Sequence, residues 1–469
     1  MKAKKSDSKG QINIEIQRKT SSNLKWLLKA ILENDDLPRL YVIIDEYDNF
    51  ANQLITAHKD SLYRELTADD SFLKTFFKTL KEGRKTGAIA NVFITGVLPI
   101  TIGYNIANFI TLEPEFEEMS GFTQTEVDKL LDEIYHDYEI EPSTRGEVEA
   151  VIKNHYNGYH FVNPEGERLY NPTLVMYFLK HLCRYQTIPK RLTDMNLKTE
   201  LSWVKRLTAS NPQNTEEFVD QLTLHNSIPY DDVFLAEKFS MFQFFEKRFF
   251  PVSFFYLGML TLRDDFYLKL PNLNMQQIFV EYFNEIHHID VSTHYAPMMQ
   301  RFVNEPNLEQ LFAGYWEHYI SQLPEVIFQQ VNENFYRTTF FDLCSRYLSR
   351  WFVWHVERSY PQGKSEIEAQ VFCPQKLEPR LEFVGKYHEK FAGLRWVIEF
   401  KYYSNTDLRK KLKTSIKQFE LIDTDTQQIK GYVKGLKKEY PEARISQFVI
   451  YCFGNQGYRV FSVPNVNVT

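Results

Sequence analysis

Hydrophobic and polar positions along the first 100 residues follow the pattern of a parallel sheet covered by helices. A helical pattern through Leu24, Leu28 and Ile31 precedes Leu40 to Ile44, five consecutive apolar or aromatic residues that predict a strand buried on both faces. A helical stretch over residues 71–80 leads to a second predicted strand, residues 91–95. This order predicts two neighbouring parallel strands joined by a crossover helix.

Acidic residues directly follow the first of these strands. Asp45 and Glu46 stand at its carboxyl end, where open α/β sheets bind their ligands, and Thr95 ends the second strand. In P-loop NTPases an Asp at this position holds magnesium and the following Glu orients water, so Asp45 and Thr95 are candidate nucleotide-binding residues and Glu46 a candidate catalytic residue. The same pattern also fits a buried strand that runs into an acidic turn, with Thr95 as a turn residue.

The pattern becomes helical after Gly121. Thr123 and Glu126 have the spacing of a capping box, Gly158 predicts a helix end, and Asn171-Pro172 predicts a new helix start, so we expect a small helical subdomain. Further on, a helix, a glycine, a hairpin and a second helix over residues 254–286 are compatible with a winged-helix module.

Four histidines in this middle part are expected to be packing or surface residues. No carboxylate or second imidazole stands at metal-binding spacing from His155 or His160. His287 and His288 are adjacent and so point to different faces; both are interpreted as surface residues.

A last domain begins near Glu333 with an aromatic-rich pattern, interpreted as one long helix that runs through Phe352 and Trp354 and ends before Pro361. Strand-like segments follow, and a basic amphipathic helix is predicted between the third and the fourth of them. The predicted strands cover residues 369–372, 381–384, 394–401 and 447–452, and the basic helix covers residues 408–421.

Two acids and a lysine converge in this pattern. The period of two in a strand puts Glu399 and Lys401 on one face, and Glu382 on the preceding predicted strand supplies a second carboxylate. Glu382 and Glu399 would hold Mg²⁺, Lys401 would stabilise charge on a phosphate, and Gln428 on a later helix would lean over the scissile bond. A plain Glu-Lys pair on a half-solvated strand explains the same residues.

Composition narrows the function classes only a little. The 469-residue chain is 43% hydrophobic and 25% charged, which is typical of a soluble protein of several domains. A net charge of -6 confines any nucleic-acid surface to a local patch, such as the basic run Arg409 to Lys417, which equally fits a solvated helix face. Four cysteines without a CxxC pair, no apolar signal region and no apolar run of 18 residues predict a cytoplasmic protein with no membrane span.

The ordered set of short motifs resembles one bacterial family, the AAA-ATPase-like proteins with a carboxyl-terminal PD-(D/E)XK nuclease-like domain. The landmarks that carry the resemblance are Ile44 to Asp48, Phe93 to Gly96, Gly121 to Thr123, Tyr156 to Tyr159, Tyr170 to Pro172, Gly258 to Thr261, Pro271-Asn272 and Glu399 to Lys401. The resemblance implies an α/β protein with a P-loop ATPase core that binds ATP, a helical lid, a winged-helix-like segment and a restriction-endonuclease-like domain.

The chain departs from the family pattern at two places. No G-x-x-x-x-G-K-[ST] loop precedes Leu40, so the core is interpreted as truncated at its amino end, and ATP hydrolysis by this chain is not expected. The family's Gly-Arg-hydrophobic-Asp element appears as residues 379–382, with the longer Glu382 in place of Asp. Glu333 and Glu368 fall where the family carries further acids.

The predicted domains are a truncated ATPase core over residues 1–120, a lid over 121–190, a helical and winged-helix-like region over 191–320, and a nuclease-like domain over 321–469. The leading hypothesis is a nuclease-like protein that acts on nucleic acid with Mg²⁺. The alternative is a catalytically degenerate remnant or scaffold for protein partners. The strand over Leu40 to Ile44 also predicts an exposed edge or apolar face, hence self-association or association with a missing amino-terminal segment.

Overall fold

The computed structural model describes residues 22–49, 61, 71–99, 108–189, 191–193, 212–236, 243–292, 294–348, 351–360, 363–371, 393–411 and 415–464. The chain divides into two compact units, each described by itself below. The first comprises residues 1–117, 198–212 and 229–260, and the second comprises residues 118–197, 213–228 and 261–469. None of the described helices is both long enough and apolar enough to cross a membrane.

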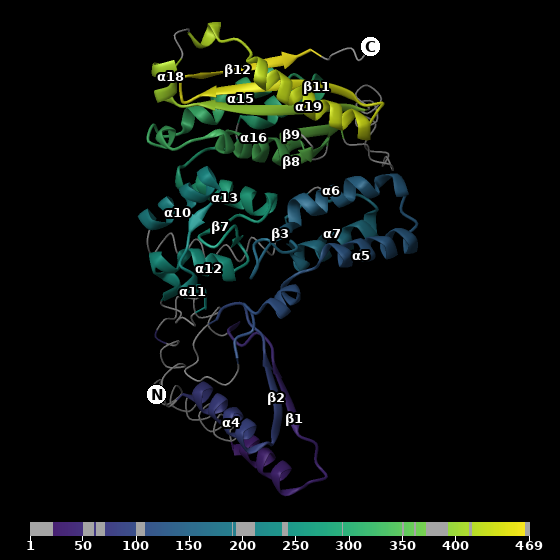
Figure 1. Cartoon of the computed structure of the whole chain (residues 1–469), viewed down its shortest axis with the longest axis vertical. Coiled ribbons are helices and arrows are strands. Elements are labelled where there is room, and N and C mark those ends of the chain that lie inside the picture. The colour runs from purple at the N-terminus through teal and green to yellow at the C-terminus, as the bar shows by residue number, and fades with distance from the viewer. Residues whose placement is uncertain are drawn as a thin grey trace, which may run out of the picture. The chain divides into compact units, whose positions relative to one another are not determined.

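The first unit contains the predicted pair of parallel strands. β1 (Leu40–Ile44) pairs in parallel with β2 (Ile89–Ile94), and α4 (Phe72–Thr86) connects them (Figure 1). Ser71 caps α4 by accepting a hydrogen bond from the Lys74 amide, and Gly87 ends the helix with a φ of 89°. The helical residues 22–33 and α4 bury Leu28, Phe77 and Leu80 against this small sheet. The strand-helix-strand prediction is therefore confirmed.

The opposite side chains of this sheet are exposed. Tyr41 and Ile43 of β1 are 77% and 75% exposed, and Phe93 of β2 is 40% exposed. The prediction that β1 is buried on both faces is therefore wrong for the described residues. The side chains of β1 alternate between partly buried and exposed because the helical residues 22–33 and α4 contribute their core side chains to one face. The remaining described elements of this unit are α11 (Asp232–Ala236), η3 (Gln243–Phe245), η4 (Lys247–Phe249) and α12 (Phe250–Tyr256).

The second unit begins with a group of helices that matches the predicted helical subdomain in its local signals. Thr123 and Glu126 form the capping box of α5 (Gln124–Asp137), and Asn171 caps α7 (Pro172–Tyr185), whose first residue is a proline. Between them lie η2 (Pro142–Thr144), α6 (Arg145–Tyr156), β3 (Asn157–Tyr159) and β4 (Leu169–Tyr170); η1 (Pro114–Ser120) precedes α5. A shared core of Leu131, Ile152 and Phe178 joins these helices.

Several sequence landmarks meet in this unit through backbone contacts. Gly158 has a φ of 117°, and a Cβ built there would lie 2.1 Å from the carbonyl oxygen of Pro271. The Asn171 amide donates to the carbonyl of Tyr156, and the Thr261 hydroxyl donates to the carbonyl of His160. These motifs thus connect segments of the second unit that are far apart in the sequence.

We expect Gly158→Ala to destabilise this unit by about 3 kcal/mol or more, because Ala would combine a disfavoured backbone conformation with a steric clash. Gly146 is a matched control within α6, since a Cβ there has nothing within 4 Å. Gly146→Ala should be neutral or stabilise by about 0.5–1 kcal/mol. Thermal unfolding of the full chain compares the two, and equal midpoints would contradict the account.

The next part of the second unit is largely helical. Of the order that suggested a winged helix, the β6–β7 hairpin and α13 lie in this unit, whereas α12 and Gly258 belong to the first unit. A winged-helix assignment stays a prediction. The elements are α10 (Pro212–His225), β5 (Ile228–Pro229), β6 (Thr261–Leu262), β7 (Tyr267–Lys269), α13 (Leu273–Ile286), α14 (Tyr295–Asn304), α15 (Leu308–His318), η5 (Ile320–Gln322) and η6 (Ile327–Gln329).

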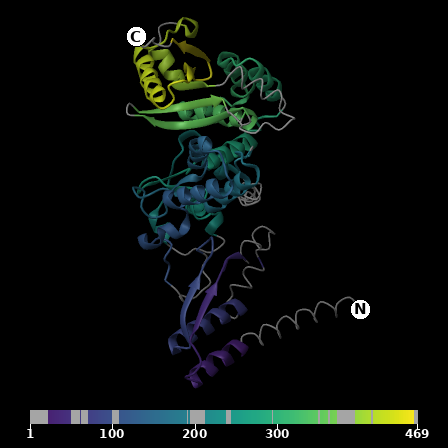
Figure 2. The ribbon, with the colours of Figure 1, turned by 90° about the vertical axis from the view of Figure 1, so that its right-hand side faces the viewer.

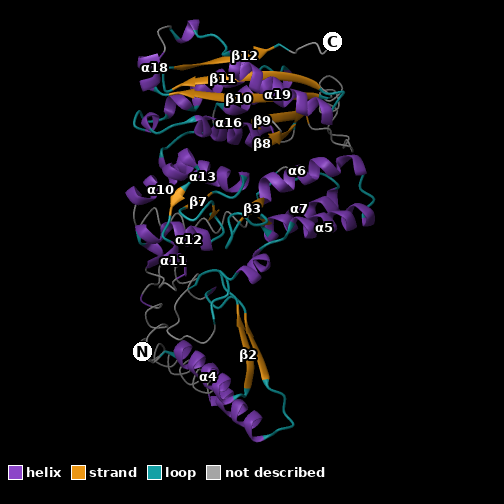
Figure 3. Cartoon of the chain, in the orientation of Figure 1, coloured by secondary structure: helices purple, strands orange, loops and turns teal. Residues whose placement is uncertain are grey.

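The carboxyl-terminal part of the unit is a five-stranded sheet with helices on both faces (Figure 3). The strand order is β12-β11-β10-β9-β8, in which only β10 and β11 are parallel. The elements are α16 (Glu333–Leu348), β8 (Phe352–Tyr360), β9 (Gly363–Val371), β10 (Leu394–Tyr403), α18 (Asn405–Lys411), η8 (Ile416–Gln418), α19 (Asp423–Glu439), β11 (Arg444–Phe453) and β12 (Gly457–Val463). Figure 2 shows this sheet from the side.

The two faces of β10 carry different side chains. Val397 belongs to the core formed with α19, whereas Phe400 packs against Phe340 of α16 with ring centroids 5.9 Å apart. Because side chains alternate along a strand, Glu399 and Lys401 lie on the α19 face with Val397. The sheet therefore presents the Glu-Lys pair beneath α19.

Two helix predictions in this part are wrong. The long helix ends at Leu348, and Phe352 and Trp354 lie in β8. Four consecutive residues from Phe352 to His355 are buried, so both faces of β8 are covered and the sequence lacks a clear alternation. The basic helix predicted over residues 408–421 is replaced by α18 and η8, because Ser415 has an extended backbone with φ -65° and ψ 153°.

Candidate active site

Glu399, Lys401 and Gln428 come together on the α19 face of the sheet. Lys401 Nζ lies 3.0 Å from Glu399 Oε1, and Gln428 Nε2 donates to the same oxygen at 2.8 Å. Gln428 Nε2 also donates to the hydroxyl of Tyr432, one turn further along α19, at 2.6 Å. A strand and a helix that are distant in sequence thus fix one carboxylate from two sides.

The second oxygen of Glu399 has no such partner. Glu399 is only 1% exposed, and its Oε2 is buried without a hydrogen-bond donor among the described residues. A buried carboxylate oxygen without a donor is costly unless a proton or a cation satisfies it. The geometry thus leaves one coordination position of Glu399 available.

Burial raises the pKa of Glu399 to about 7. The charge and the hydrogen bond of Lys401 lower this pKa, whereas the negative charges of Glu333 and Asp425 raise it further. Burial alone would lower the pKa of Lys401, but the carboxylates of Glu399 and Glu333 raise it above its ordinary value. Lys401 is therefore a cation at neutral pH, whereas Glu399 is close to its titration point.

Glu368 adds a second carboxylate on the same face. It lies in β9, is 1% exposed, and pairs with Val397 of β10. Paired residues in an antiparallel ladder share a face, so Glu368 is a diagonal cross-strand neighbour of Glu399. From the sequence, Glu368 falls where the family carries a further acid, but it was not predicted to be a metal ligand.

The remaining predicted residues of this site divide into two groups. Glu382 lies outside the described residues, as do residues 379–381, so its placement stays a prediction. Glu333 begins α16 and acts on both Glu399 and Lys401 through its charge.

Asp425 is a nearby acid that the sequence analysis missed. Its Oδ2 accepts from the Tyr451 hydroxyl at 2.5 Å, and its charge raises the pKa of both Glu399 and Lys401. Asp425 stands three residues before Gln428 on the same helix, and this spacing could have indicated that the two side chains are neighbours.

The carboxyl ends of β1 and β2 bring Asp45 and Thr95 together. The Thr95 hydroxyl donates to Asp45 Oδ1, and the Glu46 amide donates to the same Asp45 oxygen at 3.0 Å. Glu46 has a φ of 51°, and its carboxylate accepts from Asn49 at 2.8 Å. The expectation that Thr95 stands beside Asp45 is confirmed, while a nucleotide role for these residues stays a prediction.

Asp48 at the end of the same motif is a structural residue. It is fully buried and accepts from the backbone amides of Val97 and Leu98, at 3.2 and 2.8 Å. A Cβ at Gly96 would lie 2.6 Å from the Asp48 carboxylate, so glycine is required at that position. Asp48 therefore connects the loop that follows β1 to the loop that follows β2 through these hydrogen bonds.

Of the four histidines interpreted from the sequence, three have buried side chains and one is exposed. His155 and His160 are buried, as expected for packing residues, and burial lowers the pKa of His155 to about 4 despite a hydrogen bond to Asn274. His288 is exposed. The interpretation of His287 as a surface residue is wrong, because its side chain is 6% exposed and bonds Asp220 at 2.7 Å.

Two family models match separate parts of the chain. Residues 1–104 match the family model described as predicted AAA-ATPase, and residues 331–462 match the model of the PD-(D/E)XK nuclease superfamily. The chain thus carries an AAA-ATPase-like region and a PD-(D/E)XK nuclease superfamily domain, the architecture that the sequence landmarks indicated. No curated protein and no solved structure matches the chain.

Proposed function

We propose that the carboxyl-terminal domain is a divalent-metal-dependent nuclease whose central residues are Glu399, Glu368, Lys401 and Gln428. The observation that carries the proposal is the unequal hydrogen bonding of the two oxygens of the Glu399 carboxylate. Two donors hold Oε1, while Oε2 is buried and has no donor among the described residues. This arrangement supports a carboxylate that is oriented to bind a cation.

The residues fit a hard divalent ion such as Mg²⁺. Glu399 and Glu368 would hold it, because carboxylate oxygens on one face of a sheet are the ligands that Mg²⁺ prefers, and Glu382 stays a further predicted ligand. When bound, such an ion polarises the phosphate and lowers the pKa of a coordinated water.

Lys401 and Gln428 have roles that follow from their contacts. Lys401, with a side chain 20% exposed, retains its positive charge and is the group that would stabilise negative charge building up on a phosphate. Gln428 fixes the orientation of Glu399 and is itself held by its bond to Tyr432. We therefore propose Lys401 as a catalytic residue and Gln428 as a positioning residue.

The test is cleavage of labelled single- and double-stranded DNA and RNA by the full chain with Mg²⁺ or Mn²⁺. Lys401→Ala should lower the rate by about 10²-fold or more without unfolding the domain. Lys434, exposed on α19, is the matched control, and Lys434→Ala should retain the activity. Equal activity of the two variants would overturn the role of Lys401, and the absence of cleavage in the unmodified chain would favour a degenerate scaffold.

For the amino-terminal region we propose that this chain does not hydrolyse ATP. Asp45 and Glu46 are present, but residues 1–39 of the given sequence contain no G-x-x-x-x-G-K-[ST] motif, whose backbone amides and lysine hold the phosphates. We expect no measurable ATPase activity and no magnesium-ATP affinity tighter than about millimolar. A calorimetric titration that gives micromolar affinity would contradict this.

We also propose that the exposed face of β1 and β2 mediates self-association. Tyr41 and Ile43 expose apolar area on one side of the short sheet formed by β1 and β2. Ile43→Thr should shift the protein toward monomer in light scattering, whereas Val326→Thr, at an exposed position of the second unit, should not. A chain that is monomeric at high concentration would contradict the proposal.

A further inference from the structure

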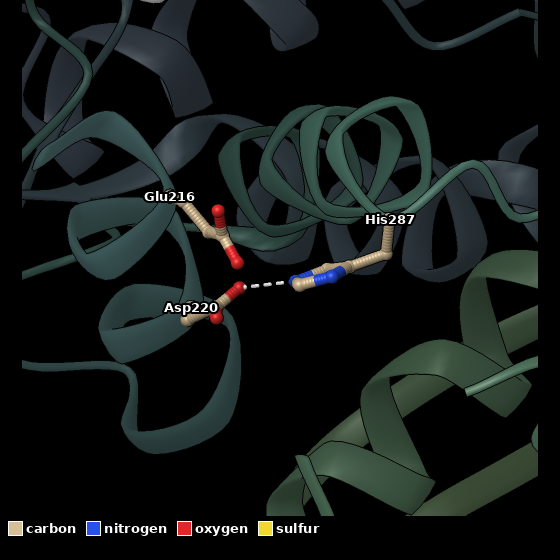
Figure 4. Close-up of side chains that lie close together, drawn as sticks. All are labelled: Glu216, Asp220 and His287. Atoms are coloured by element: carbon tan, nitrogen blue, oxygen red, sulfur yellow. Dashed lines mark hydrogen bonds and ion pairs between the residues drawn. The ribbon is translucent and has the colours of Figure 1, made fainter. Parts of the chain in front are cut away.

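Three side chains outside the nuclease-like site converge on one point of the second unit. Glu216 and Asp220 of α10 and His287 at the end of α13 each offer one ligand atom, and these atoms all lie within 4.8 Å of one another. Figure 4 shows both carboxylates and the imidazole pointing toward one another. His287 Nε2 lies 2.7 Å from Asp220 Oδ1.

The fold prepares this arrangement before any ligand is added. Glu216 and Asp220 are four residues apart, so they lie on one side of α10. The His287 amide donates to the Phe283 carbonyl, and the imidazole lies against the Phe283 ring with centroids 4.5 Å apart. His288 adopts a φ of 54°, which turns the chain away directly after His287. The imidazole is therefore fixed in place facing α10.

The helices also pack independently of the cluster. Phe218 of α10 and Phe279 of α13 have ring centroids 6.3 Å apart, and the Thr223 hydroxyl donates to the Phe279 carbonyl. Substitution of a cluster residue would thus leave the contact between the two helices in place.

The imidazole of His287 pairs with only one of the two carboxylates. Like charges four residues apart on a helix repel each other, and the Asp220-His287 contact satisfies only one of the two carboxylates. Glu216 has no hydrogen-bond or ion-pair partner among the described residues and is exposed, so its carboxylate remains free to bind a ligand at this point.

We infer that Glu216, Asp220 and His287 form a second metal site, separate from the nuclease-like site, that takes a transition-metal ion of the zinc class. Imidazole and carboxylate groups both bind ions of this class, whereas Mg²⁺ prefers oxygen ligands alone. Tetrahedral ligands about 2.1 Å from one ion are about 3.4 Å apart, so binding would replace the 2.7 Å Asp220–His287 hydrogen bond and draw the three ligand atoms, now within 4.8 Å of one another, around the ion. The ion would join α10 to α13, with its remaining position open to solvent.

The experiment is a Zn²⁺ titration of the full chain against a chromophoric chelator, with excess Mg²⁺ and in a Glu399→Gln background so that the nuclease-like site does not contribute. One zinc ion should bind, and thermal stability should rise with zinc. Glu216→Gln and His287→Gln should each weaken binding about tenfold or more, since even outer-shell changes at metal sites cost that much. Glu217→Gln, the same charge change at the adjacent exposed position, should not.

Cobalt supplies an independent readout of the ligands. A Co²⁺-substituted chain should show a visible absorption band that His287→Gln removes and Glu217→Gln retains. The inference is overturned if no stoichiometric zinc binds, or if binding is the same in Glu216→Gln and Glu217→Gln. In those cases the cluster is only an Asp-His hydrogen bond with a neighbouring glutamate. Neither outcome depends on nuclease activity, so this test is separate from that of the proposed function.

Discussion

Glu399→Gln should abolish metal-dependent cleavage, by about 10²-fold or more, and leave the folded domain as stable as before, or more stable, above pH 7. Glutamine keeps the shape of the side chain and can still contact Gln428, but it removes the charge that a cation needs. Burial raises the pKa of Glu399 to about 7, so the ionised carboxylate opposes folding at higher pH. Lys401 retains Glu333 and Asp425 as neighbouring charges.

Cleavage assays and thermal unfolding at pH 8 on the same preparations measure both effects. Glu420→Gln is the matched control, since Glu420 is exposed and precedes α19 in the same domain. Loss of activity together with loss of stability would mean that Glu399 is a structural ion-pair partner of Lys401. Loss of activity alone is the result that the account requires.

Metal affinity and stability should change with pH in opposite directions. Because the folded-state pKa of Glu399 lies above its ordinary value of 4.5, the folded state binds the extra proton and this group's contribution to stability falls as pH rises from about 4.5 through about 7. A cation competes with that proton, so Mg²⁺ affinity should rise by up to about tenfold per pH unit below pH 7 and level off above it.

Calorimetric titrations with Mn²⁺ and Mg²⁺ between pH 5.5 and 8.5, of the wild-type chain and of Glu399→Gln, isolate this effect. The difference between the two proteins removes the contributions of other titrating groups. Affinity that is independent of pH in the wild-type chain would show that Glu399 is not a ligand.

Local patterns predicted the parts of both sites that depend on strand and helix periods. The period of two placed Glu399 and Lys401 on one face, and the order strand, helix, strand placed Thr95 beside Asp45. Both relations follow from backbone geometry within an element or between adjacent strands.

The rest depended on long-range packing. Burial of both faces removes the alternation that would identify β8, and the sequence could not indicate that the core side chains of helical residues 22–33 and α4 pack on one face of β1. Glu368 required the register between β9 and β10, which a sequence does not contain. His287 required the pairing of α13 with α10, and its ligand-like partners are about 70 residues away in the chain.

The most direct test of the nuclease-like site compares magnesium-dependent cleavage by the wild-type chain, Glu368→Gln and Glu382→Gln under identical conditions. Glu368 shares the α19 face with Glu399, so we expect cleavage by the wild-type chain and its loss in Glu368→Gln. Cleavage should also be lost in Glu382→Gln, since Glu382 is the further predicted ligand. Full activity of Glu368→Gln, or no metal-dependent cleavage by the wild-type chain on any DNA or RNA substrate, would contradict the proposed site.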